Sequence, residues 1–271
     1  MARRLLPAKY RPAVITFVDI LGFREIVHRR GAEDVHRILG RLRSFAARED
    51  GSAEGEHTRA FSFSDSVIRV RFFDSEYSSG ALFHEALSLV HAQGELISDG
   101  ILLRGGMTTG DVHVEDNAIF GPGFIRAYGL ESEFANYPRI VVGPEAFADL
   151  RSDARLHASH HDLVDEIHYL RRLLRRADDG LWFVDYLKAF RAEMDEPELY
   201  PEILMSHRAS IVAGAAESHA PRVLQKYLWM ALYHNQVCQE FGYDDEFMLT
   251  TTDIPFLEAL SERSPDIADD D

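Results

Sequence analysis

The stretch ITFVDILGFREIV (residues 15–27) decides the fold, because it joins a buried strand to a helix across one charged residue. Its first residues are apolar and β-branched, a pattern typical of a strand inside a sheet. Asp19 stands where this strand ends, and Gly22 precedes a helical pattern. A helix cap, a tight turn and a metal site all place an aspartate at such a position. The rest of the sequence is needed to choose among these three roles.

The composition is that of an ordinary globular protein with an acidic balance. The chain has 271 residues, of which 46% are hydrophobic and 27% charged, and its formal net charge is −16. Nucleic acid and anionic membranes are not expected as partners, since both attract a basic surface. No stretch approaches the ~18 apolar residues of a membrane span, and the basic N-terminus lacks the apolar core of a signal peptide. The single cysteine, Cys238, cannot form an internal disulfide. These features predict a cytoplasmic protein.

The apolar patterns along the chain predict an α+β domain followed by helices. The expected elements are strand 13–19, helix 23–48 interrupted at Gly31, hairpin strands within 58–73 around Ser64-Asp65, helix 80–97, strand region 101–114 broken by Gly105 and Gly106, strand 118–120, helix 124–134, strand 139–142, helices 144–150 and 161–176, and strand 181–186. The initial β-α-β-β-α-β order is the ferredoxin-like or palm arrangement, in which a mixed sheet carries helices on one face.

Three parts of the chain differ in pattern. Residues 1–187 hold the alternating strands and helices, and from Leu187 onward the pattern is helical. We expect residues 188–262 to form a helical extension that packs on the domain or across a dimer. The acidic tail at 263–271 is expected to be disordered.

Two aspartates are expected at the same edge of the sheet. In a palm-type sheet the first strand lies beside the central hairpin, so Asp19 at the strand end and Asp65 at the hairpin turn emerge side by side. Two unpaired carboxylates repel each other, and a divalent cation removes that conflict. Carboxylate oxygens suit Mg²⁺ or Mn²⁺ carried in with substrate phosphates. Singly, Asp19 could cap a helix and Asp65 could be a turn residue. As a pair they favour a metal site.

Arg104 is a candidate ligand of a phosphate group. It precedes two glycines in LLRGGMTTGDV (102–112). Arginine offers a planar fork of donors that matches phosphate oxygens. The alternative is an arginine at the rim of the domain that pairs with one of the many acidic side chains, with glycines that serve only a bulge.

Several stretches of the chain resemble class III nucleotide cyclase catalytic domains. They are FVDILGF (17–23), FSDSVI (63–68), RGGMTTGDV (104–112) and IFGPGFIRAYGLES (119–132), in the family order and at family-like spacing. ANYPRIVV (135–142) and KYLWMALYHN (226–235) are similar to one branch, the bacterial Pycsar cyclases, which are antiphage enzymes that make cyclic CMP or cyclic UMP. The resemblance implies that residues 1–187 form a nucleotide cyclase catalytic domain.

The resemblance implies a role for each residue of the opening stretch. Asp19 and Asp65 match the aspartates that bind two divalent ions, Mn²⁺ or Mg²⁺, and Ile20 matches the residue that adds a backbone carbonyl to one of them. Gly22 and Phe23 match the turn whose amides meet the triphosphate, where the start of a helix favours negative charge.

The resemblance also implies a homodimer with active sites at the interface between subunits. Arg104 matches an arginine that reaches the triphosphate. This chain has a basic run of four arginines, Arg171, Arg172, Arg175 and Arg176. The run resembles the place from which a partner subunit supplies a phosphate-binding cation in the family. A solvated helix face is the alternative for each member of that run.

The residues expected to read the base depart from those of purine cyclases. Phe61 stands where such enzymes have a lysine, and Ala118 where they have a polar selector. A smaller pocket, with Phe61 at the substrate, suits a pyrimidine. The helix asparagine and arginine that stabilise the transition state align with Ile125 and Gly129. Arg126, on nearly the same side of the helix, is the candidate substitute.

The expected function is therefore a pyrimidine nucleotide cyclase that converts UTP, or CTP, to the 3′,5′-cyclic nucleotide and pyrophosphate by a two-metal mechanism. UTP is preferred by resemblance alone. Such an enzyme would generate a second messenger in antiphage defence and act on a separately encoded effector. The alternatives are a catalytically inactive cyclase fold used as a nucleotide sensor or dimerisation module, and a purine (adenylate or guanylate) cyclase. A cyclic dinucleotide synthase is disfavoured because the chain lacks a GGDEF-like segment.

Overall fold

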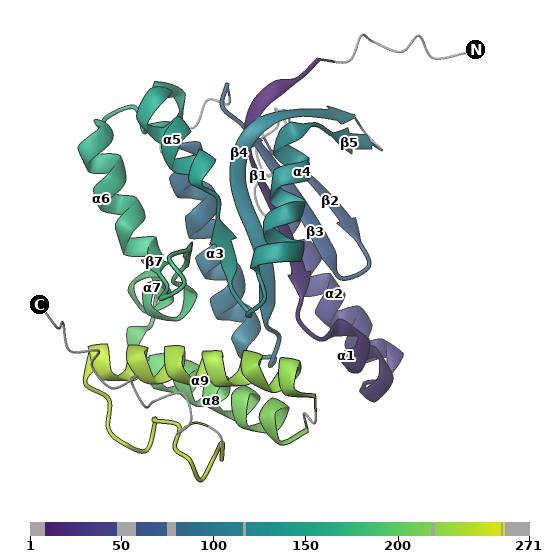
Figure 1. Ribbon diagram of the computed structural model, residues 1–271, viewed down its shortest axis with the longest axis vertical. Helices are drawn as coiled ribbons and strands as arrows, with labels where there is room; N and C mark the ends of the chain where they lie inside the picture. The colour runs from purple at the N-terminus through teal and green to yellow at the C-terminus, as the bar shows by residue number, and fades with distance from the viewer. Residues whose placement is uncertain are drawn as a thin grey trace, which may run out of the picture.

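The structure is a computed structural model, and it describes residues 9–47, 58–74, 80–115, 118–217, 220–255 and 257. The acidic tail at 263–271 lies outside these residues. Within them, eight strands form one sheet in the order β2-β3-β1-β4-β6-β8-β7, with β5 paired to β4 (Figure 1). The strands are β1 (Arg11–Ile20), β2 (Thr58–Phe63), β3 (Ser66–Phe72), β4 (Leu103–Glu115), β5 (Ala118–Phe120), β6 (Ile140–Val142), β7 (Leu174–Arg176) and β8 (Trp182–Val184).

Helices connect the strands and continue beyond the sheet. They are α1 (Phe23–Arg29), α2 (Ala32–Ala47), α3 (Ala81–Ile97), α4 (Pro122–Gly129) with a π-helical turn η1 (Leu130–Phe134), α5 (Pro144–Ser152), α6 (Leu163–Leu173), α7 (Tyr186–Glu193), α8 (Tyr200–Glu217) and α9 (Pro221–Phe241), with short 3-10 turns η2 (Ala154–Leu156) and η3 (Pro197–Leu199). The interruption predicted at Gly31 separates α1 from α2.

The first half of the chain confirms the predicted α+β fold with its ferredoxin-like core. The elements β1, α1, α2, β2, β3, α3 and β4 follow one another, and the strands lie in the spatial order β2-β3-β1-β4. The central strand β1 is antiparallel to both β3 and β4, and β6 is parallel to β4, so the sheet is mixed. This order places the β2–β3 hairpin beside the first strand.

Helices cover both faces of the sheet, so the expectation of helices on one face is wrong. Successive residues of a strand point to opposite faces. Val14 and Val18 of β1 pack into the main core together with α2 and α3. Ile15 packs on the other side with Ala127 of α4. Asp19 alternates in phase with Ile15 and therefore points to the face that carries α4.

The strand β4 runs unbroken through its two glycines, contrary to the expectation of a break. Leu103–Glu115 is one strand and pairs with β1 over ten residues. A Cβ atom at Gly106 would lie 2.4 Å from Cβ of Leu130 in η1, and one at Gly105 would lie 2.4 Å from the backbone oxygen of Phe17. The glycines are needed because neighbouring chain segments approach the strand closely. They let η1 lie directly on the sheet.

The predicted helix 161–176 is too long at both ends. α6 begins after Asp162, whose carboxylate accepts hydrogen bonds from the amides of Val164 and Asp165. The last predicted turn is the strand β7, which pairs antiparallel with β8. Pairing with a neighbouring strand outweighs the helical preference of these residues.

The helices α8 and α9 lie across one end of the sheet, at the bottom of Figure 1. Leu204 of α8 and Val237 of α9 belong to the same apolar cluster as the inner residues of the sheet. A second cluster, which includes Ile211 and Met230, joins the two helices to each other. None of the helices in the described part of the chain combines the length and the apolarity that a membrane crossing requires.

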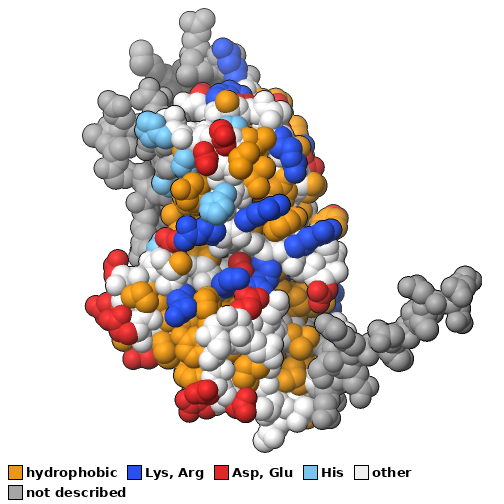
Figure 2. All heavy atoms as spheres, turned by 90° about the vertical axis from the view of Figure 1, so that its left-hand side faces the viewer, with side chains coloured by type: hydrophobic (Ala, Val, Ile, Leu, Met, Phe, Trp, Pro, Cys, Tyr) orange, Lys and Arg blue, Asp and Glu red, His pale blue; other side chains and the backbone are white. Residues whose placement is uncertain are grey.

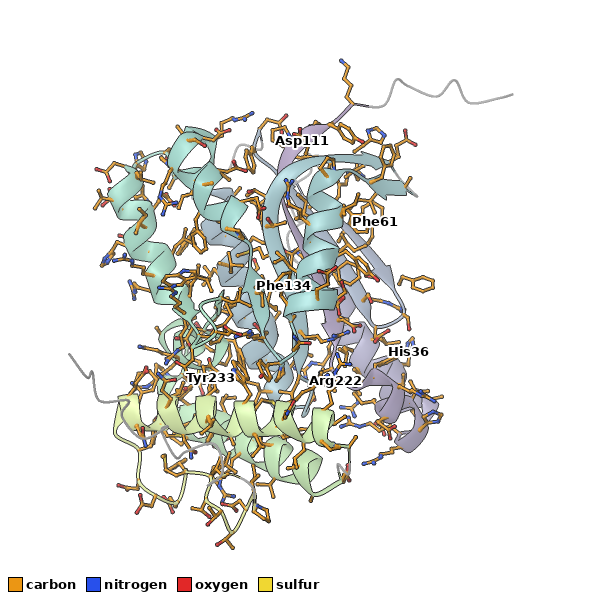
Figure 3. All side chains as sticks on the ribbon, in the orientation of Figure 1. His36, Phe61, Asp111, Phe134, Arg222 and Tyr233 are labelled. Atoms are coloured by element: carbon orange, nitrogen blue, oxygen red, sulfur yellow. The ribbon has the colours of Figure 1, made fainter. Side chains whose placement is uncertain are left out.

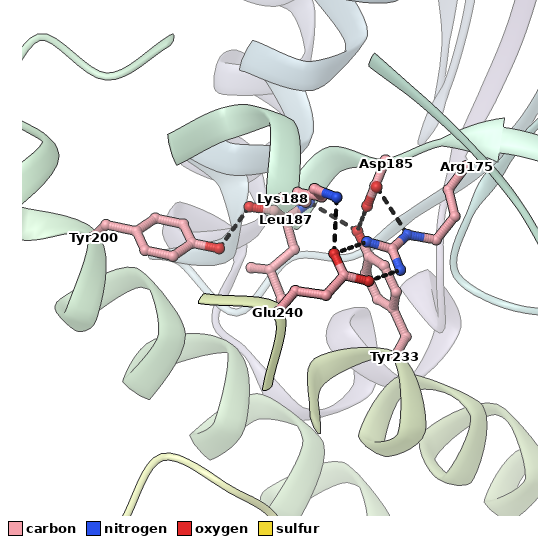
Figure 4. Close-up of polar contacts among 7 residues, drawn as sticks. All are labelled: Arg175, Asp185, Leu187, Lys188, Tyr200, Tyr233 and Glu240. Atoms are coloured by element: carbon pink, nitrogen blue, oxygen red, sulfur yellow. Dashed lines mark hydrogen bonds and ion pairs between the residues drawn. The ribbon is translucent and has the colours of Figure 1, made fainter. Parts of the chain in front are cut away.

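An ionic network around the buried Asp185 fastens α9 to the sheet (Figure 4). Arg175 of β7 donates to Asp185 at 2.8 Å, and its two terminal nitrogens donate to the carboxylate of Glu240 in α9 at 2.7 and 2.8 Å. Tyr233 of α9 donates to Asp185 at 2.7 Å, and Lys188 lies 2.9 Å from Glu240. The hydrogen bond from Arg175 is the main reason that the pKa of Glu240 falls to about 2. Glu240 therefore stays ionised across the ordinary pH range, whereas burial raises the pKa of Asp185.

Candidate active site

Several of the expected site residues meet at the end of β1, on the face of the sheet that carries α4. Asp19 is the penultimate residue of β1, and its cross-strand neighbours are Ser66 on β3 and Arg104 on β4. The Ser66 hydroxyl donates to Oδ1 of Asp19 at 3.3 Å, and the Arg104 guanidinium donates to Oδ2 at 3.3 Å. The Asp19 side chain is 18% exposed. Its carboxylate is thus held in place by neighbours and still reachable from solvent.

Asp65 lies beside Asp19, as the topology predicts. It is the second residue of the two-residue turn between β2 and β3, and Ser64 before it takes a positive φ of 54°, as tight hairpin turns require. Burial raises the pKa of Asp19 to about 7, with further contributions from a hydrogen bond to Asp65 and from its negative charge. Arg104 opposes this shift. The carboxylate of Asp19 therefore lies within hydrogen-bonding distance of that of Asp65.

Arg104 also contacts an acidic residue that the sequence did not suggest. Its terminal nitrogen lies 2.5 Å from Oε1 of Glu131 in η1. The Glu131 side chain is 5% exposed, and burial raises its pKa while the charge of Arg104 lowers it. π-helical turns such as η1 occur frequently at functional sites. Arg104 is thus shared between two carboxylates, those of Asp19 and Glu131.

Ile20, Gly22 and Phe23 occupy the turn that follows Asp19. The Ile20 side chain is buried in the main core, so only its backbone is available to a ligand. Gly22 precedes α1 with a left-handed φ of 73°, and its carbonyl accepts a hydrogen bond from the amide of Glu25 at 2.9 Å. Phe23 packs against the edge of the main core. The chain therefore turns sharply within three residues of the carboxylate.

Phe61 belongs to an apolar row on the same face of the sheet. Phe61, Ile68 and Phe17 are cross-strand neighbours on β2, β3 and β1. The ring of Tyr128 in α4 contacts the ring of Phe17 at a centroid distance of 5.4 Å. Phe17 is two residues before Asp19 and lies on the same face of β1. The apolar row is therefore roughly 7 Å from the carboxylates. The end of the row at Phe61 is on the outermost strand β2 (Figure 3).

Arg126 and Ala118 lie away from the carboxylates of their own chain. Arg126 donates to the carbonyl oxygen of Thr109 at 3.0 Å. Thr109 pairs with Val14, five residues before Asp19 on β1, which corresponds to roughly 17 Å of strand. Ala118 pairs still farther along β4. A contact between Arg126 and a ligand held by Asp19 would therefore need a second subunit.

The basic run 171–176 is separated from the site by two strands, since β8 and β6 lie between β7 and β4. Lys and Arg side chains gather across the middle of the face shown in Figure 2. Arg171, Arg172 and Arg175 line an open cavity of about 550 Å³. Arg175 is bound to acidic side chains of its own chain, and the exposed Arg171 and Arg172 are left for a ligand or partner.

A second residue that sequence reasoning missed reaches the site from α9. Lys226 is half-buried and lines a cavity together with Leu21 and Gly22. Its charge lowers the pKa of Glu131. Glu131 and Lys226 both lie in stretches that carried the resemblance to cyclases. No local pattern places either of them beside Asp19, because that depends on how η1 and α9 pack on the sheet.

The donor groups fit a divalent cation that is bound together with phosphate. Among the residues that the structure describes, no three His, Cys, Asp or Glu side chains are arranged as a complete metal site. Asp19 and Asp65 supply two carboxylates; the pKa of Asp19 is raised mainly by burial and further by Asp65, and a cation would stabilise the ionised form of both. Mg²⁺ is commonly held by one or two carboxylates and completes its shell with water and substrate phosphates. These residues suit Mg²⁺ or Mn²⁺ in that mode.

No protein-family profile and no curated protein matches the sequence. Among solved structures, the chain is similar to the dimeric guanylyl cyclase domain of the RhoGC fusion protein from the aquatic fungus Blastocladiella emersonii, at 15% identity and a TM-score of 0.45, over 66% of this chain and 96% of that one. The guanylyl cyclase Cya2 is similar at 14% identity and a TM-score of 0.40, over 66% and 94% of the two chains. The adenylate/guanylate cyclase/hydrolase from Silicibacter pomeroyi is similar at 20% identity and 0.40, over 54% and 83%. Likenesses this low carry no conclusion about substrate or activity.

Proposed function

We propose that the chain is a nucleotide cyclase that converts a pyrimidine nucleoside triphosphate, UTP or CTP, to the 3′,5′-cyclic nucleotide and pyrophosphate. The observation that carries the proposal is the pair Asp19 and Asp65, which lie side by side at the end of β1 next to Arg104. The stretches that hold these three residues resemble class III nucleotide cyclases. The carboxylate pair suits phosphate chemistry because it can hold a divalent cation against a polyphosphate.

The reaction forms one bond and breaks one bond at the α-phosphorus. The ribose 3′-hydroxyl releases its proton to solvent, and its oxygen attacks the α-phosphorus while the bond to the oxygen that bridges to the β-phosphate breaks to release pyrophosphate. Asp19 and Asp65 would hold two divalent ions, Mn²⁺ or Mg²⁺. Bound there, such ions lower the pKa of the hydroxyl and offset the charge on pyrophosphate. No nucleophilic side chain is required.

Arg104 supplies positive charge where the polyphosphate would lie. Its guanidinium is oriented from two sides, by Asp19 and by the buried Glu131. A fixed cation of this kind stabilises developing charge without reorganisation during the reaction. Asp19 has to be ionised to bind a cation, and its pKa of about 7 places this ionisation near neutral pH. Cyclase activity should therefore rise with pH through neutrality.

The preference for a pyrimidine rests on the side chains that align with the base-reading residues of purine cyclases. Phe61 and Ala118 stand at the places where purine cyclases have hydrogen-bonding side chains, and neither offers a polar side-chain atom. The apolar row that ends at Phe61 is two residues along β1 from Asp19, on the same face of the sheet. An apolar site of this kind cannot form the side-chain hydrogen bonds by which such enzymes discriminate purines.

A homodimer is part of the proposal, because α4 and the β2–β3 hairpin expose large apolar side chains. Phe63 is 84% exposed, Ile125 69% and Tyr128 51%. Apolar side chains in such positions are typical of contact surfaces. A second copy that covers α4 would also bring another Arg126 toward a site that it cannot reach in its own chain. The product would serve as a second messenger in antiphage defence, acting on an effector encoded elsewhere.

One observation favours a second candidate, an inactive cyclase fold that senses nucleotides. Ile125 occupies the place of the family's asparagine and offers no hydrogen bond, and Arg126 is held by the carbonyl oxygen of Thr109. The experiment is to incubate the purified chain with ATP, GTP, CTP and UTP separately, with Mn²⁺, and to identify cyclic products by mass spectrometry. Cyclic UMP or cyclic CMP supports the proposal, cyclic AMP or cyclic GMP overturns the pyrimidine preference, and binding without product supports the sensor.

A further inference from the structure

An open cavity of about 640 Å³ lies beside the turn that follows Asp19, between the start of α1 and the helices α8 and α9. Leu21 and Gly22, which follow Asp19 closely in the chain, line this cavity together with Lys226 of α9. Figure 3 shows Arg222 at the end of α9 that lies beneath the sheet. The C-terminal helices therefore meet the domain at the turn that follows the catalytic aspartate.

Lys226 and Arg30 are the two cations in the cavity lining whose side chains have no ion pair with a described residue. The two acidic residues in its lining, Glu25 and Glu217, both pair with Arg29. Lys226 forms no hydrogen bond and no ion pair with any residue that the structure describes, although its side chain is half-buried. A partly desolvated ammonium without a partner is costly, so this position favours an anion.

The charges around Lys226 are those of the active site. Burial lowers the pKa of Lys226, and the charges of Arg104 and Arg222 lower it further, whereas Asp19 and Glu131 act in the opposite direction. Salt screens interactions between exposed charges beyond about 10 Å, so these charges lie in one region of the molecule. Lys226 therefore belongs to the same cluster of charges as Arg104, Asp19 and Glu131.

The backbone that carries Lys226 is held firmly against the sheet. Trp229 lies one helical turn after it, and residues at this spacing share a side of the helix. The Trp229 ring stacks on Tyr137 with a centroid distance of 5.3 Å and an angle of 8° between the planes. The Arg139 guanidinium lies 5.5 Å from the Trp229 ring. The packing of Trp229 therefore fixes the position of the helical turn that carries Lys226.

We infer that Lys226 is a substrate-binding residue whose ammonium contacts the polyphosphate of the nucleotide held at Asp19 and Asp65. This inference rests on the proposed function and deepens it, because it makes the helical extension part of the active site. A polyphosphate carries several negative charges, and lysine binds phosphate as a point charge. The competing role for Lys226 is an internal counter-charge for Glu131 with no contact to substrate.

Binding of inorganic tripolyphosphate tests the inference without requiring turnover. Isothermal titration calorimetry with Mg²⁺ would compare the full chain with Lys226→Met, Lys226→Arg and the control Arg222→Met, which removes an exposed charge one turn earlier on α9. Loss of one charge-assisted contact predicts that Lys226→Met binds about 10- to 100-fold more weakly. Lys226→Arg should restore binding to within roughly threefold, and Arg222→Met should change it by less than that. Wild-type affinity in Lys226→Met, or no binding by the wild-type chain, overturns the inference.

A second measurement needs no variant and so does not depend on variants that fold. The rate of acetylation at Lys226 would be followed by peptide mass spectrometry with and without tripolyphosphate. Direct contact predicts protection of Lys226 and unchanged labelling of Lys188, which pairs with Glu240 elsewhere. Equal labelling of Lys226 in both conditions supports the counter-charge role and overturns the inference. If no cyclic nucleotide forms from any triphosphate, the proposed reaction fails, while both measurements still decide whether Lys226 binds polyphosphate.

Discussion

Asp19 and Arg104 face each other across β1 and β4, with the guanidinium 3.3 Å from the carboxylate. This single cation does not neutralise its surroundings, because Arg104 also contacts Glu131 and Asp65 lies on the other side of Asp19. Three carboxylates therefore lie close together at the end of β1, and Arg104 contacts two of them, those of Asp19 and Glu131. A divalent cation would offset the excess negative charge there.

The first prediction concerns stability against pH in protein treated with EDTA. The pKa of Asp19 is raised from 3.8 to about 7 by folding, so between these values the folded chain binds a proton that the unfolded chain has released. The stability associated with Asp19 is complete below pH 4 and is lost as pH rises through 7. The free energy of unfolding should fall by about 2–4 kcal/mol more in the wild type than in Asp19→Asn over this window.

Urea unfolding at a series of pH values measures that difference. Adding Mg²⁺ at pH 8 should stabilise the wild type more than Asp19→Asn, because the variant keeps only one carboxylate of the pair, that of Asp65. A difference between the two proteins that stays constant from pH 4 to pH 8 would show that Asp19 does not titrate as described.

The second prediction concerns Gly106, where η1 touches β4. A methyl group at Gly106 would lie 2.4 Å from Cβ of Leu130 and 2.6 Å from the carbonyl oxygen of Ala127. Gly106→Ala should cost about 1–3 kcal/mol of stability, because backbone cannot move aside as a flexible side chain can. The control is Gly40→Ala in α2, where no atom lies within 4 Å and a gain of about 0.5–1 kcal/mol is expected. Thermal unfolding of both variants gives the comparison, and equal effects would refute the close approach.

The third prediction separates two arginines of the basic run. Arg175 holds the buried Asp185 and also Glu240, so Arg175→Ala leaves a buried carboxylate without its cation. Removal of one partner from such a pair costs about 3–5 kcal/mol. Arg172 is exposed, and Arg172→Ala should change stability by less than about 0.5 kcal/mol. Chemical denaturation would measure both. Similar values for the two variants would mean that the network in Figure 4 does not anchor α9.

The fourth prediction concerns assembly. A charge at the centre of an apolar contact surface is strongly unfavourable, so Ile125→Glu should shift the chain from dimer to monomer in analytical ultracentrifugation and abolish cyclase activity with it. Val164→Glu is the matched control, because Val164 is 72% exposed on α6, away from α4. Dissociation by both variants, or by neither, would place the interface elsewhere.

Local signals in the sequence predicted much of the fold. The β-branched run before Asp19 and the tight turn at Ser64-Asp65 are short-range patterns, and the ferredoxin-like order follows from them. The strand β7 and the unbroken β4 could not be predicted in this way. Leu174–Arg176 are extended because β8 pairs with them, and Gly106 is required because η1 packs above it.

The same distinction between local patterns and long-range packing applies to the residues of the candidate site. Asp19 and Asp65 could be placed together because sheet topology relates a strand end to a neighbouring hairpin turn. Glu131 and Lys226 could not, because their positions depend on where η1 and α9 pack on the sheet. Arg126 was expected at the substrate, but its bond to Thr109 places it far from Asp19 within one chain. Its proposed role therefore depends on the dimer.

The most direct test of the central claim is the yield of cyclic nucleotide from UTP and CTP with Mn²⁺ for Asp65→Asn, with Ser64→Ala as control. Asparagine keeps the size of the side chain and removes the charge that would hold the cation. Mass spectrometry should detect cyclic UMP or cyclic CMP from the wild type and from Ser64→Ala, and at least about 1,000-fold less from Asp65→Asn. Product from Asp65→Asn at the wild-type rate would contradict the assignment of Asp19 and Asp65 as the catalytic centre.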